Sequence, residues 1–362
     1  MNLRKTVADY ERWLGRQLPL IRADLGLKHR RMREGALPFL RATYFRWAQL
    51  WPDLCPELKD APAVLAVGDL HVENFGTWRD AEGRLAWGIN DFDEAWRLPY
   101  ANDLVRLATS VMLAGDASAL RLDPGAAASA IITGYRESLV AGGRPLVLAE
   151  HHPALRRMAI HRLRDPEAFW HQLDTSAPVR SRLPPSATSA LSKLWPAREL
   201  PWRIVHRVAG LGSLGRQRFV ALAEWNGGRI AREAKGLTVS AGEWAAGRRE
   251  RDTPLYREIL AGAVRCADPF VAVRKRWLVR RLAPDCSRIE LASLPRGRDE
   301  RRLLHAMGWE TANVHLGSIR AHRILSDLDR RPHDWLVRAA DTMSAAVKKD
   351  FSTWRRETAA GF

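Results

Sequence analysis

The sequence lacks the features of a secreted or membrane-spanning protein. It has only three cysteines, Cys55, Cys266 and Cys286, and this odd number without metal-ligand spacing argues against a disulfide framework. No run approaches the roughly 20 apolar residues of a membrane span. Charged residues occupy the N-terminal stretch where a signal peptide would need an apolar core. We therefore expect a cytoplasmic protein without a membrane partner.

Acidic residues are scarce relative to basic ones, and the formal net charge is +17. Such a balance favours acidic partners such as phosphates or nucleic acid. Arginine is spread along the whole chain, however, so a solvated basic surface explains the charge, and we do not favour nucleic acid as the partner. With 362 residues, 46% of them hydrophobic, the chain is long enough for one large or two ordinary globular domains.

Apolar periodicity changes in blocks along the chain. Helices are predicted over residues 3–24, 37–51, 101–115, 123–140 and 150–174, and from 298 to the end. Strands are predicted at 63–67, 75–78, 84–89, 203–209, 218–225, 229–235 and 270–282. The Asn-Gly-Gly at 226–228 is a strong hairpin signal. The order of these blocks predicts an α+β fold.

Carboxylates gather in one segment, residues 67–95, between strand-like runs. Asp69 follows the first of these strands, and Asn74 comes five positions later. Asn74 and Asp91 are symmetric about the turn expected near 79–83, so a hairpin would place them side by side at its open end. Their oxygens suit Mg²⁺, which takes its other ligands from water and substrate phosphates. We predict Asn74 and Asp91 as metal ligands, with Asp69 beside them.

Ordinary structural roles compete with this interpretation. Turn and capping roles are expected for three further acids in the segment, Asp80, Glu82 and Glu94. Asp103 fits the N-cap of its helix, and Asp93 fits either a structural or a functional role. His71 could be a metal ligand, but a lone histidine is more often a structural hydrogen-bonding residue, and we treat it as one.

A second motif, GLGSLG, has the pattern G-x-G-x-x-G and contains Gly210, Gly212, Ser213 and Gly215. In a dinucleotide-binding fold this pattern should open a helix, but a strand-like run follows it here. Strand, glycine loop, strand, turn and a third strand ending in Lys235 is the order of a kinase small lobe. We predict that the loop covers phosphates and that Lys235 pairs with them. The alternative is a glycine-bearing hairpin and a surface lysine.

The acidic segment resembles the catalytic region of aminoglycoside and choline phosphotransferases. GDLHVEN, residues 68–74, is similar to their H-G-D-L-H-x-x-N loop, with Val67 in place of the leading histidine. NDFDEA resembles their metal-binding I-D-F-E segment, and Asn102-Asp103-Leu104 resembles the Asp-Leu that orders the catalytic loop. The resemblance implies Asp69 as the catalytic base and Asn74 and Asp91 as metal ligands. Three supporting residues complete the expected site, His71, Asp93 and Asp103.

The chain also resembles a bacterial family known as domain of unknown function 2252, which is grouped with protein-kinase-like folds. The family's first segment, K-x-x-x-M-x-x-x-P-F-x-F-x-R-G-T, is matched by Lys28, Met32, Pro38, Phe39 and Arg41, with Ala42 where glycine is usual. GDLHVENFG, NDFDEA, GLGSLG and EAKG follow in the family's order. We count Arg41 among the supporting residues.

Together these resemblances imply a protein-kinase-like two-lobed fold. Because the glycine loop follows the catalytic loop instead of preceding it, the fold would be circularly permuted. We expect a helical lobe with the catalytic hairpin at 1–200, a small antiparallel β lobe at 201–285, and helices at 286–362 that complete the helical lobe. The lysine's helical partner would be Glu243 or Glu250.

The expected function is that of a phosphotransferase that uses ATP, or another nucleotide, with Mg²⁺. Its acceptor, a small molecule or a protein, cannot be read from the sequence. A nucleotide-binding pseudokinase or regulator is one alternative, and a nucleotidyl transferase, which uses nearly the same residues, is another. A basic nucleic-acid-binding protein is less favoured, because no recognisable binding motif accompanies the charge.

Overall fold

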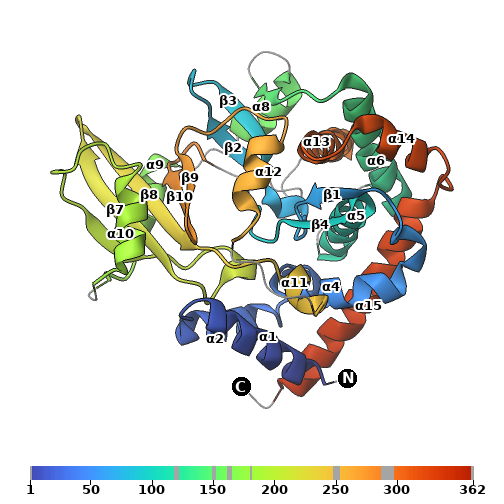
Figure 1. Cartoon of the computed structure of the whole chain (residues 1–362), viewed down its shortest axis with the longest axis horizontal. Helices are drawn as coiled ribbons and strands as arrows, with labels where there is room; N and C mark the ends of the chain where they lie inside the picture. The colour runs from blue at the N-terminus through green and yellow to red at the C-terminus, as the bar shows by residue number, and fades with distance from the viewer. Residues whose placement is uncertain are drawn as a thin grey trace.

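Seven stretches of the chain are described by this computed structural model: residues 2–117, 122–148, 152–160, 165–179, 182–247, 253–286 and 297–359. Helices and strands alternate in blocks, and the strands form three separate antiparallel sheets (Figure 1). The expected α+β class is therefore confirmed, as a mixed fold with several small sheets.

The N-terminal region folds into four short helices where we expected two longer ones. They are α1 (Leu3–Gln17), α2 (Arg22–Arg31), α3 (Ala36–Ala42) and α4 (Tyr44–Leu54), followed by the 3-10 turn η1 (Pro56–Leu58). Between α1 and α2, Leu20 forms a β-bridge with Arg216. The Ile21 N–H donates to Gly215 O at 2.8 Å. Helical periodicity cannot reveal this break, because pairing with a distant segment replaces the helix's own hydrogen bonds.

Two small sheets are built mainly from residues 63–99. Their strands are β1 (Ala63–Ala66) paired with β4 (Trp96–Pro99), and β2 (Phe75–Arg79) paired with β3 (Leu85–Ile89), which also pairs with β5 (Leu146–Val147). The 3-10 turn η2 (Val72–Asn74) leads directly into β2. The predicted hairpin is thus present, and it lies close to the carboxylates that follow β1.

The third sheet has five strands in the order β6-β7-β8-β10-β9. Their bounds are β6 (Arg203–His206), β7 (Arg218–Trp225), β8 (Gly228–Gly236), β9 (Val271–Arg274) and β10 (Trp277–Leu282). Between β7 and β8, Asn226 and Gly227 have φ of 48° and 78°, as the predicted Asn-Gly turn requires. A second turn with positive φ, at Lys275, divides the run 270–282 into two strands.

Helices cover both faces of the five-stranded sheet. Leu191 of one helix packs with Phe219 on one face, and Phe169 of another packs with Val220 on the opposite face. Neighbouring strand residues point to opposite sides, so both faces are apolar and both need a cover. The covering helices come from the stretch before residue 200, and the strands of the sheet come from the stretch after it. The two covering helices are α9 (Pro166–Asp174) and α10 (Pro185–Ser192). Helix α8 (Pro153–Ile160) packs against α13 (Gly297–His315) instead.

The remaining helices form the main hydrophobic core: α5 (Tyr100–Ala117), α6 (Pro124–Ala141), α11 (Ala241–Ala245), α12 (Tyr256–Gly262), α13 (Gly297–His315), α14 (Ala321–Leu328) and α15 (Trp335–Glu357). Two glycines let α6 and α13 pack closely, since a Cβ at Gly134 or Gly308 would lie 1.9 Å from a carbonyl oxygen of the other helix. Helix α15 packs against α1, α3 and α5, and Glu357 at its end accepts from the Arg4 N–H at 2.9 Å. Helices from the N-terminal and C-terminal parts of the chain thus share one core.

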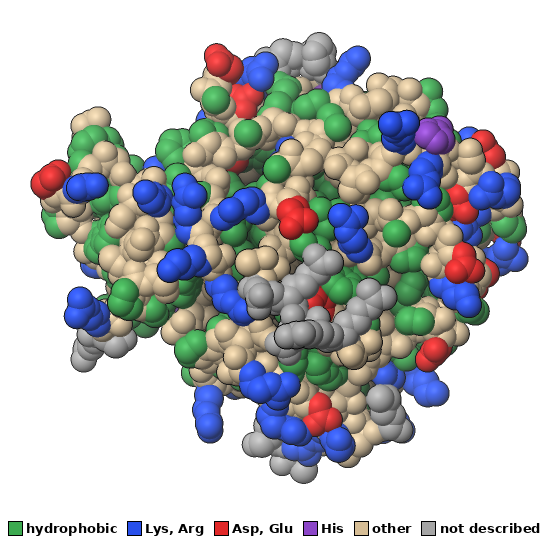
Figure 2. All heavy atoms as spheres, in the orientation of Figure 1, with side chains coloured by type: hydrophobic (Ala, Val, Ile, Leu, Met, Phe, Trp, Pro, Cys, Tyr) green, Lys and Arg blue, Asp and Glu red, His purple; other side chains and the backbone are tan. Residues whose placement is uncertain are grey.

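The face of the molecule drawn in Figure 2 carries many basic residues. On the face shown in Figure 2, lysine and arginine are spread over both the five-stranded sheet and the helical body. Within the described stretches, no helix combines the length and apolarity that crossing a membrane requires.

Candidate functional site

The loop after β1 is held by Asp103, a buried residue in the first turn of α5. Asp103 accepts hydrogen bonds from the backbone N–H of Val67 at 2.7 Å and of Gly68 at 2.9 Å. His315 Nε2 lies 3.0 Å from the same carboxylate, and Tyr135 OH lies 2.8 Å from His315 Nδ1. Helix α5 begins three residues earlier, at Tyr100, so Asp103 does not serve as its N-cap. Its carboxylate instead fixes the backbone that presents Asp69.

Asp69 faces a buried arginine that our reading of the sequence missed. Arg106 donates through Nε to Asp69 Oδ1 at 3.0 Å, and its Nη2 donates to the same oxygen. The guanidinium lies over the rings of Tyr44 and Trp47, at 5.1 and 4.9 Å from their centroids. Burial raises the pKa of Asp69 to about 7, although Arg106 opposes the rise. A carboxylate with a pKa near neutrality is suited to general-base work.

The turn η2 positions Asn74 at the entrance of the hairpin. The amide oxygen of Asn74 accepts from the His71 N–H at 2.6 Å, and His71 Nδ1 accepts from the Glu73 N–H at 3.2 Å. His71 therefore caps this turn, which is the structural role that we expected for it. The hairpin pairs Phe75 with Ile89, one position away from the predicted register. Asn90, not Asp91, is consequently opposite Asn74.

Asp91 and Asp93 share Lys235, which comes from the five-stranded sheet. Lys235 Nζ lies 3.4 Å from each carboxylate oxygen of Asp91 and is also ion-paired with Asp93. Burial opposes the ionisation of Asp91, but the charges of Lys235 and Arg280 together outweigh this effect and lower its pKa. Burial, together with the negative charge of Asp91, raises the pKa of Asp93. Asp91 is thus the member of the pair that more readily carries the negative charge.

Lys235 is buried on β8, where it is ion-paired with these two aspartates. Of the two glutamates that we considered as its helical partner, Glu243 is buried near the start of α11. Glu250 lies outside the described residues. The surface-lysine alternative is wrong, since Lys235 is 1% exposed.

The glycine loop lies directly against the catalytic loop. Gly210 and Gly215 have φ of 72° and 95°, a conformation that favours glycine. A Cβ on Gly212 would lie 3.3 Å from Asp69 Oδ2 and 3.0 Å from Arg41 O. Lys28 Nζ donates to Gly212 O at 3.1 Å and holds the loop from the other side. The loop is therefore packed over Asp69.

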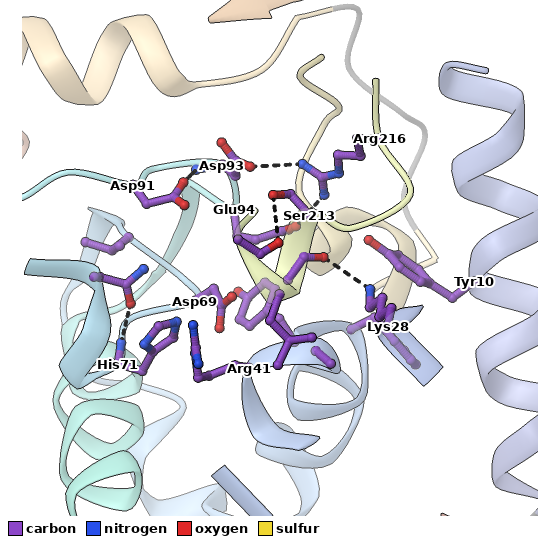
Figure 3. Close-up of a pocket in the computed structure, with 18 residues that line it drawn as sticks. Tyr10, Lys28, Arg41, Asp69, His71, Asp91, Asp93, Glu94, Ser213 and Arg216 are labelled. Carbon is purple, nitrogen blue, oxygen red and sulfur yellow. Dashed lines mark hydrogen bonds and ion pairs between the residues drawn. The ribbon is translucent and has the colours of Figure 1, made fainter. Parts of the chain in front are cut away.

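One cavity collects most of the predicted residues (Figure 3). Those lining it are Arg41, Asp69, His71, Asn74, Asp91, Asp93, Gly210, Gly212 and Ser213. Figure 3 shows Asp91 and Asp93 above Asp69, with Ser213 of the glycine loop to their right. Arg41 donates to Glu73 at 2.9 Å, and Ser213 Oγ accepts from Arg218 at 2.7 Å. Lys235 and Gly215 are not among the lining residues, although both contact segments that are.

Comparison with known proteins agrees with part of this picture. Residues 20–167 match the profile of a family described as an uncharacterized protein conserved in bacteria (DUF2252). No curated protein and no solved structure matches the chain. The matched stretch contains the loop that carries Asp69 and the hairpin, whereas the glycine loop and Lys235 lie beyond it.

Four buried charged residues of the site were not predicted: Lys28, Glu94, Arg106 and Arg216. Glu94, for which we expected a turn or capping role, accepts from Arg216 at 2.9 Å and from the Ala241 N–H at 2.6 Å. Burial lowers the pKa of Lys28 to about 8. Lys28 was visible as part of a family motif, and Arg106 follows Asp103 by three positions, one helical turn. Neither of these sequence signals predicts what Lys28 or Arg106 contacts, because those contacts depend on the fold.

The oxygen ligands of this cavity fit a hard cation. Asn74 Oδ1 uses one lone pair for His71 and retains another, and Asp91 is 28% exposed and negatively charged. Among the residues described, no group of three or more His, Cys, Asp and Glu side chains is arranged to hold a metal by itself. A site with only two or three protein oxygens suits Mg²⁺ that arrives with substrate phosphates.

Asp80 has the turn role that we expected for it. Its carboxylate accepts hydrogen bonds from the backbone N–H groups of Glu82 and Arg84 within the hairpin turn.

Proposed function

We propose that this protein is a phosphotransferase with a kinase-like, circularly permuted arrangement, acting on a nucleotide with Mg²⁺ and an acceptor hydroxyl. One observation carries the proposal. Asp69, Asn74, Asp91 and the glycine loop line one cavity, and Lys235 pairs with Asp91 at its edge. These are the residue types, and the spatial relations, that phosphoryl transfer uses for base, metal ligands, phosphate cover and phosphate-pairing lysine.

The proposed chemistry assigns one task to each residue. Asp69, with its pKa near 7, accepts the proton of the acceptor hydroxyl as the oxygen attacks the terminal phosphorus. The new O–P bond forms while the bond to the bridging oxygen breaks, and its electron pair leaves on the nucleoside diphosphate. Asn74 and Asp91 would hold Mg²⁺, which neutralises charge on the phosphates. Lys235 would leave the aspartates to pair with a phosphate.

The order of elements supports the permuted arrangement. Strand, glycine loop, strand, turn and lysine-bearing strand occur in β6 to β8, followed by α11, α12 and two further strands. The helical body follows at the C-terminus and is completed by helices from the N-terminus. An ordinary kinase has the same elements with the catalytic loop at the end of this series.

The glycine loop must move before a nucleotide can bind in this way. Gly212 lies against Asp69 where phosphates would have to pass, and Lys28 holds it there. Glycine loops and lobes of such enzymes move by hinge closure, so a closed loop is compatible with the proposal.

The test compares wild type with Asp69→Asn in two assays. Calorimetry should show ATP binding that is strengthened by Mg²⁺ in both proteins. An acceptor screen with ATP labelled on its terminal phosphate should give a product only in the wild type, with transfer by the variant at least about 10²-fold slower. Absence of Mg²⁺-dependent nucleotide binding in the wild type would refute the proposal. Equal turnover by the two proteins would remove Asp69 from the mechanism.

A further inference from the structure

A second cavity lies beside Asp91 and is lined by four arginines. These are Arg207 after β6, Arg265 after α12, and Arg280 and Arg281 of β10. Among the residues that the structure describes, two acidic ones line it, Asp91 and Asp268. Asp91 is already paired with Lys235, so the cavity wall has an excess of positive charge.

The cationic wall is anchored by a buried carboxylate outside the cavity lining. Glu233 accepts from Arg207 at 2.7 Å, from Arg218 at 3.1 Å and from Arg280 at 2.7 Å. One carboxylate cannot neutralise three guanidinium groups, and burial makes the uncompensated charge costly. Glu233 therefore orients the arginines and leaves their excess charge available for another anion.

The other two arginines are held by aromatic rings. Arg265 lies over Trp78, 4.5 Å from the ring centroid, and donates to Ile89 O at 3.0 Å. Arg281 lies over Phe270 at 4.6 Å, and its Nε and Nη2 are buried without a hydrogen-bond partner among the described residues. A buried donor without an acceptor costs free energy, which the oxygens of an anion would recover. Stacking fixes the planes of the guanidinium groups, as recognition of phosphate by arginine requires.

We propose that this arginine cavity binds a phosphate or diphosphate group, at the end of the site away from Asp69. The proposal deepens the proposed function and rests on it. Phosphoryl oxygens match guanidinium donors in charge and geometry. The group could come from two sources, the polyphosphate tail of the nucleotide or a phosphate carried by the acceptor. In either case Asp91, which lines both cavities, lies between the bound phosphate and the cavity that contains Asp69.

Binding of inorganic pyrophosphate, measured by calorimetry without Mg²⁺, tests the cavity independently of any nucleotide. We expect wild type to bind, and Arg281→Gln to bind at least about tenfold more weakly because a charge-assisted contact is lost. Arg274→Gln is the matched control, since Arg274 is exposed on the neighbouring strand and lies outside the cavity. Lys28 lines the cavity that contains Asp69, so Lys28→Gln should bind pyrophosphate with the affinity of the wild type. No binding by wild type, equal binding by Arg281→Gln, or loss only in Lys28→Gln would overturn the proposal.

A second measurement needs no variant. Cys286 lines the arginine cavity, whereas Cys266 does not. Pyrophosphate should slow the alkylation of Cys286 by N-ethylmaleimide at least about threefold and leave the rate at Cys266 unchanged. Peptide mass spectrometry measures the two rates separately. A threefold effect is expected at a pyrophosphate concentration of about twice Kd, where about two-thirds of the cavities are occupied. Equal rates with and without pyrophosphate would overturn the proposal. Protection by adenosine instead of pyrophosphate would do so too, and would assign the cavity to the base.

The source of the phosphate is read from the same assays with Mg²⁺-ATP. If the nucleotide tail enters the cavity, ATP protects Cys286, and Arg281→Gln weakens ATP binding. If the acceptor supplies the group, ATP binds Arg281→Gln as well as wild type and leaves Cys286 reactive. Either result supports an anion cavity once pyrophosphate binding has been seen. If pyrophosphate binds but ATP does not, the cavity stands and the proposed function fails.

Discussion

Lys235 and Asp91 are 144 positions apart in the chain, yet the lysine Nζ lies 3.4 Å from both carboxylate oxygens of the aspartate. This ion pair joins the five-stranded sheet to the segment that follows the hairpin. It also keeps Asp91 charged in a buried setting, since the lysine lowers the pKa of Asp91 against the effect of burial. A metal with nucleotide phosphates would find both a ligand and a counter-charge here.

Replacing Lys235 with methionine tests the lysine's role in nucleotide binding. The substitution removes the lysine charge beside Asp91 and Asp93, so a bound phosphate would lose this cation and meet more of the negative charge of the two carboxylates. We expect Mg²⁺-ATP binding to weaken at least about tenfold in calorimetry, as for a lost charge-assisted contact. Lys275→Met, an exposed lysine in the turn between β9 and β10, should bind as wild type does. Equal affinities of the two variants for Mg²⁺-ATP would indicate that the glycine loop and Lys235 have only a structural role.

Asp91→Asn should act on the metal instead. The amide keeps the shape but loses the negative charge that Mg²⁺ requires, so Mg²⁺ should no longer strengthen ATP binding. The measurement is an ATP titration with and without Mg²⁺. Asp80→Asn, at the turn of the same hairpin, is the control and should keep the full effect of Mg²⁺, because its carboxylate is bound to Arg84. A metal effect that survives in Asp91→Asn would show that the ligand lies elsewhere.

The pKa of Asp69 predicts how transfer depends on pH. A base works in its deprotonated form, and the pKa of Asp69 is raised to about 7, mainly by burial. The value of kcat/KM should therefore fall about tenfold per pH unit below pH 7 and level off above it. Arg106 lowers this pKa, so Arg106→Gln should move the acid limb to higher pH, and Arg106→Lys should move it less. Profiles of kcat/KM at saturating Mg²⁺ give the comparison.

A structural role alone would produce a different pattern. If Arg106 only supports the fold, Arg106→Gln would lower kcat/KM equally at every pH and reduce the melting temperature. An acid limb at the same pH in all three proteins would contradict the assignment of Asp69 as the titrating base.

Much of the fold could be read from local patterns, because the patterns coincide with local causes. The Asn-Gly turn determines the β7–β8 hairpin through backbone conformation, and the continuous apolar run at 219–223 marked β7. The breaks in the N-terminal helices and the register of the β2–β3 hairpin depend on partners elsewhere in the chain. Leu20, for example, leaves the helix to pair with Arg216. A symmetry argument about a turn carries an error of one residue, which is the error found at Asn74.

The site divides in the same way. Asp69, Asn74 and Asp91 stand in one short segment, so their residue types and spacing predicted their proximity. The role of Arg106 could not be predicted in this way, because an arginine in a helix is common and only the fold brings this one into contact with Asp69. The arginine cavity is the extreme case, because its arginines come from separate elements and only the folded sheet brings them together.

Gly212 offers the sharpest test of the closed glycine loop. Its backbone conformation does not require glycine, but a Cβ there would lie 3.0 Å from Arg41 O and 3.3 Å from Asp69 Oδ2. Gly212→Val should therefore hold the loop away from the catalytic loop and lower transfer at least about tenfold, since misplacement of groups by about 1 Å costs about 10²-fold. The melting temperature should change little, because the loop's flanking strands keep their pairing. Gly228→Ala, where the nearest atom is 3.9 Å away, is the matched control and should transfer normally. If Gly212→Val turns over as fast as this control, the contact between Gly212 and Asp69 has no part in catalysis.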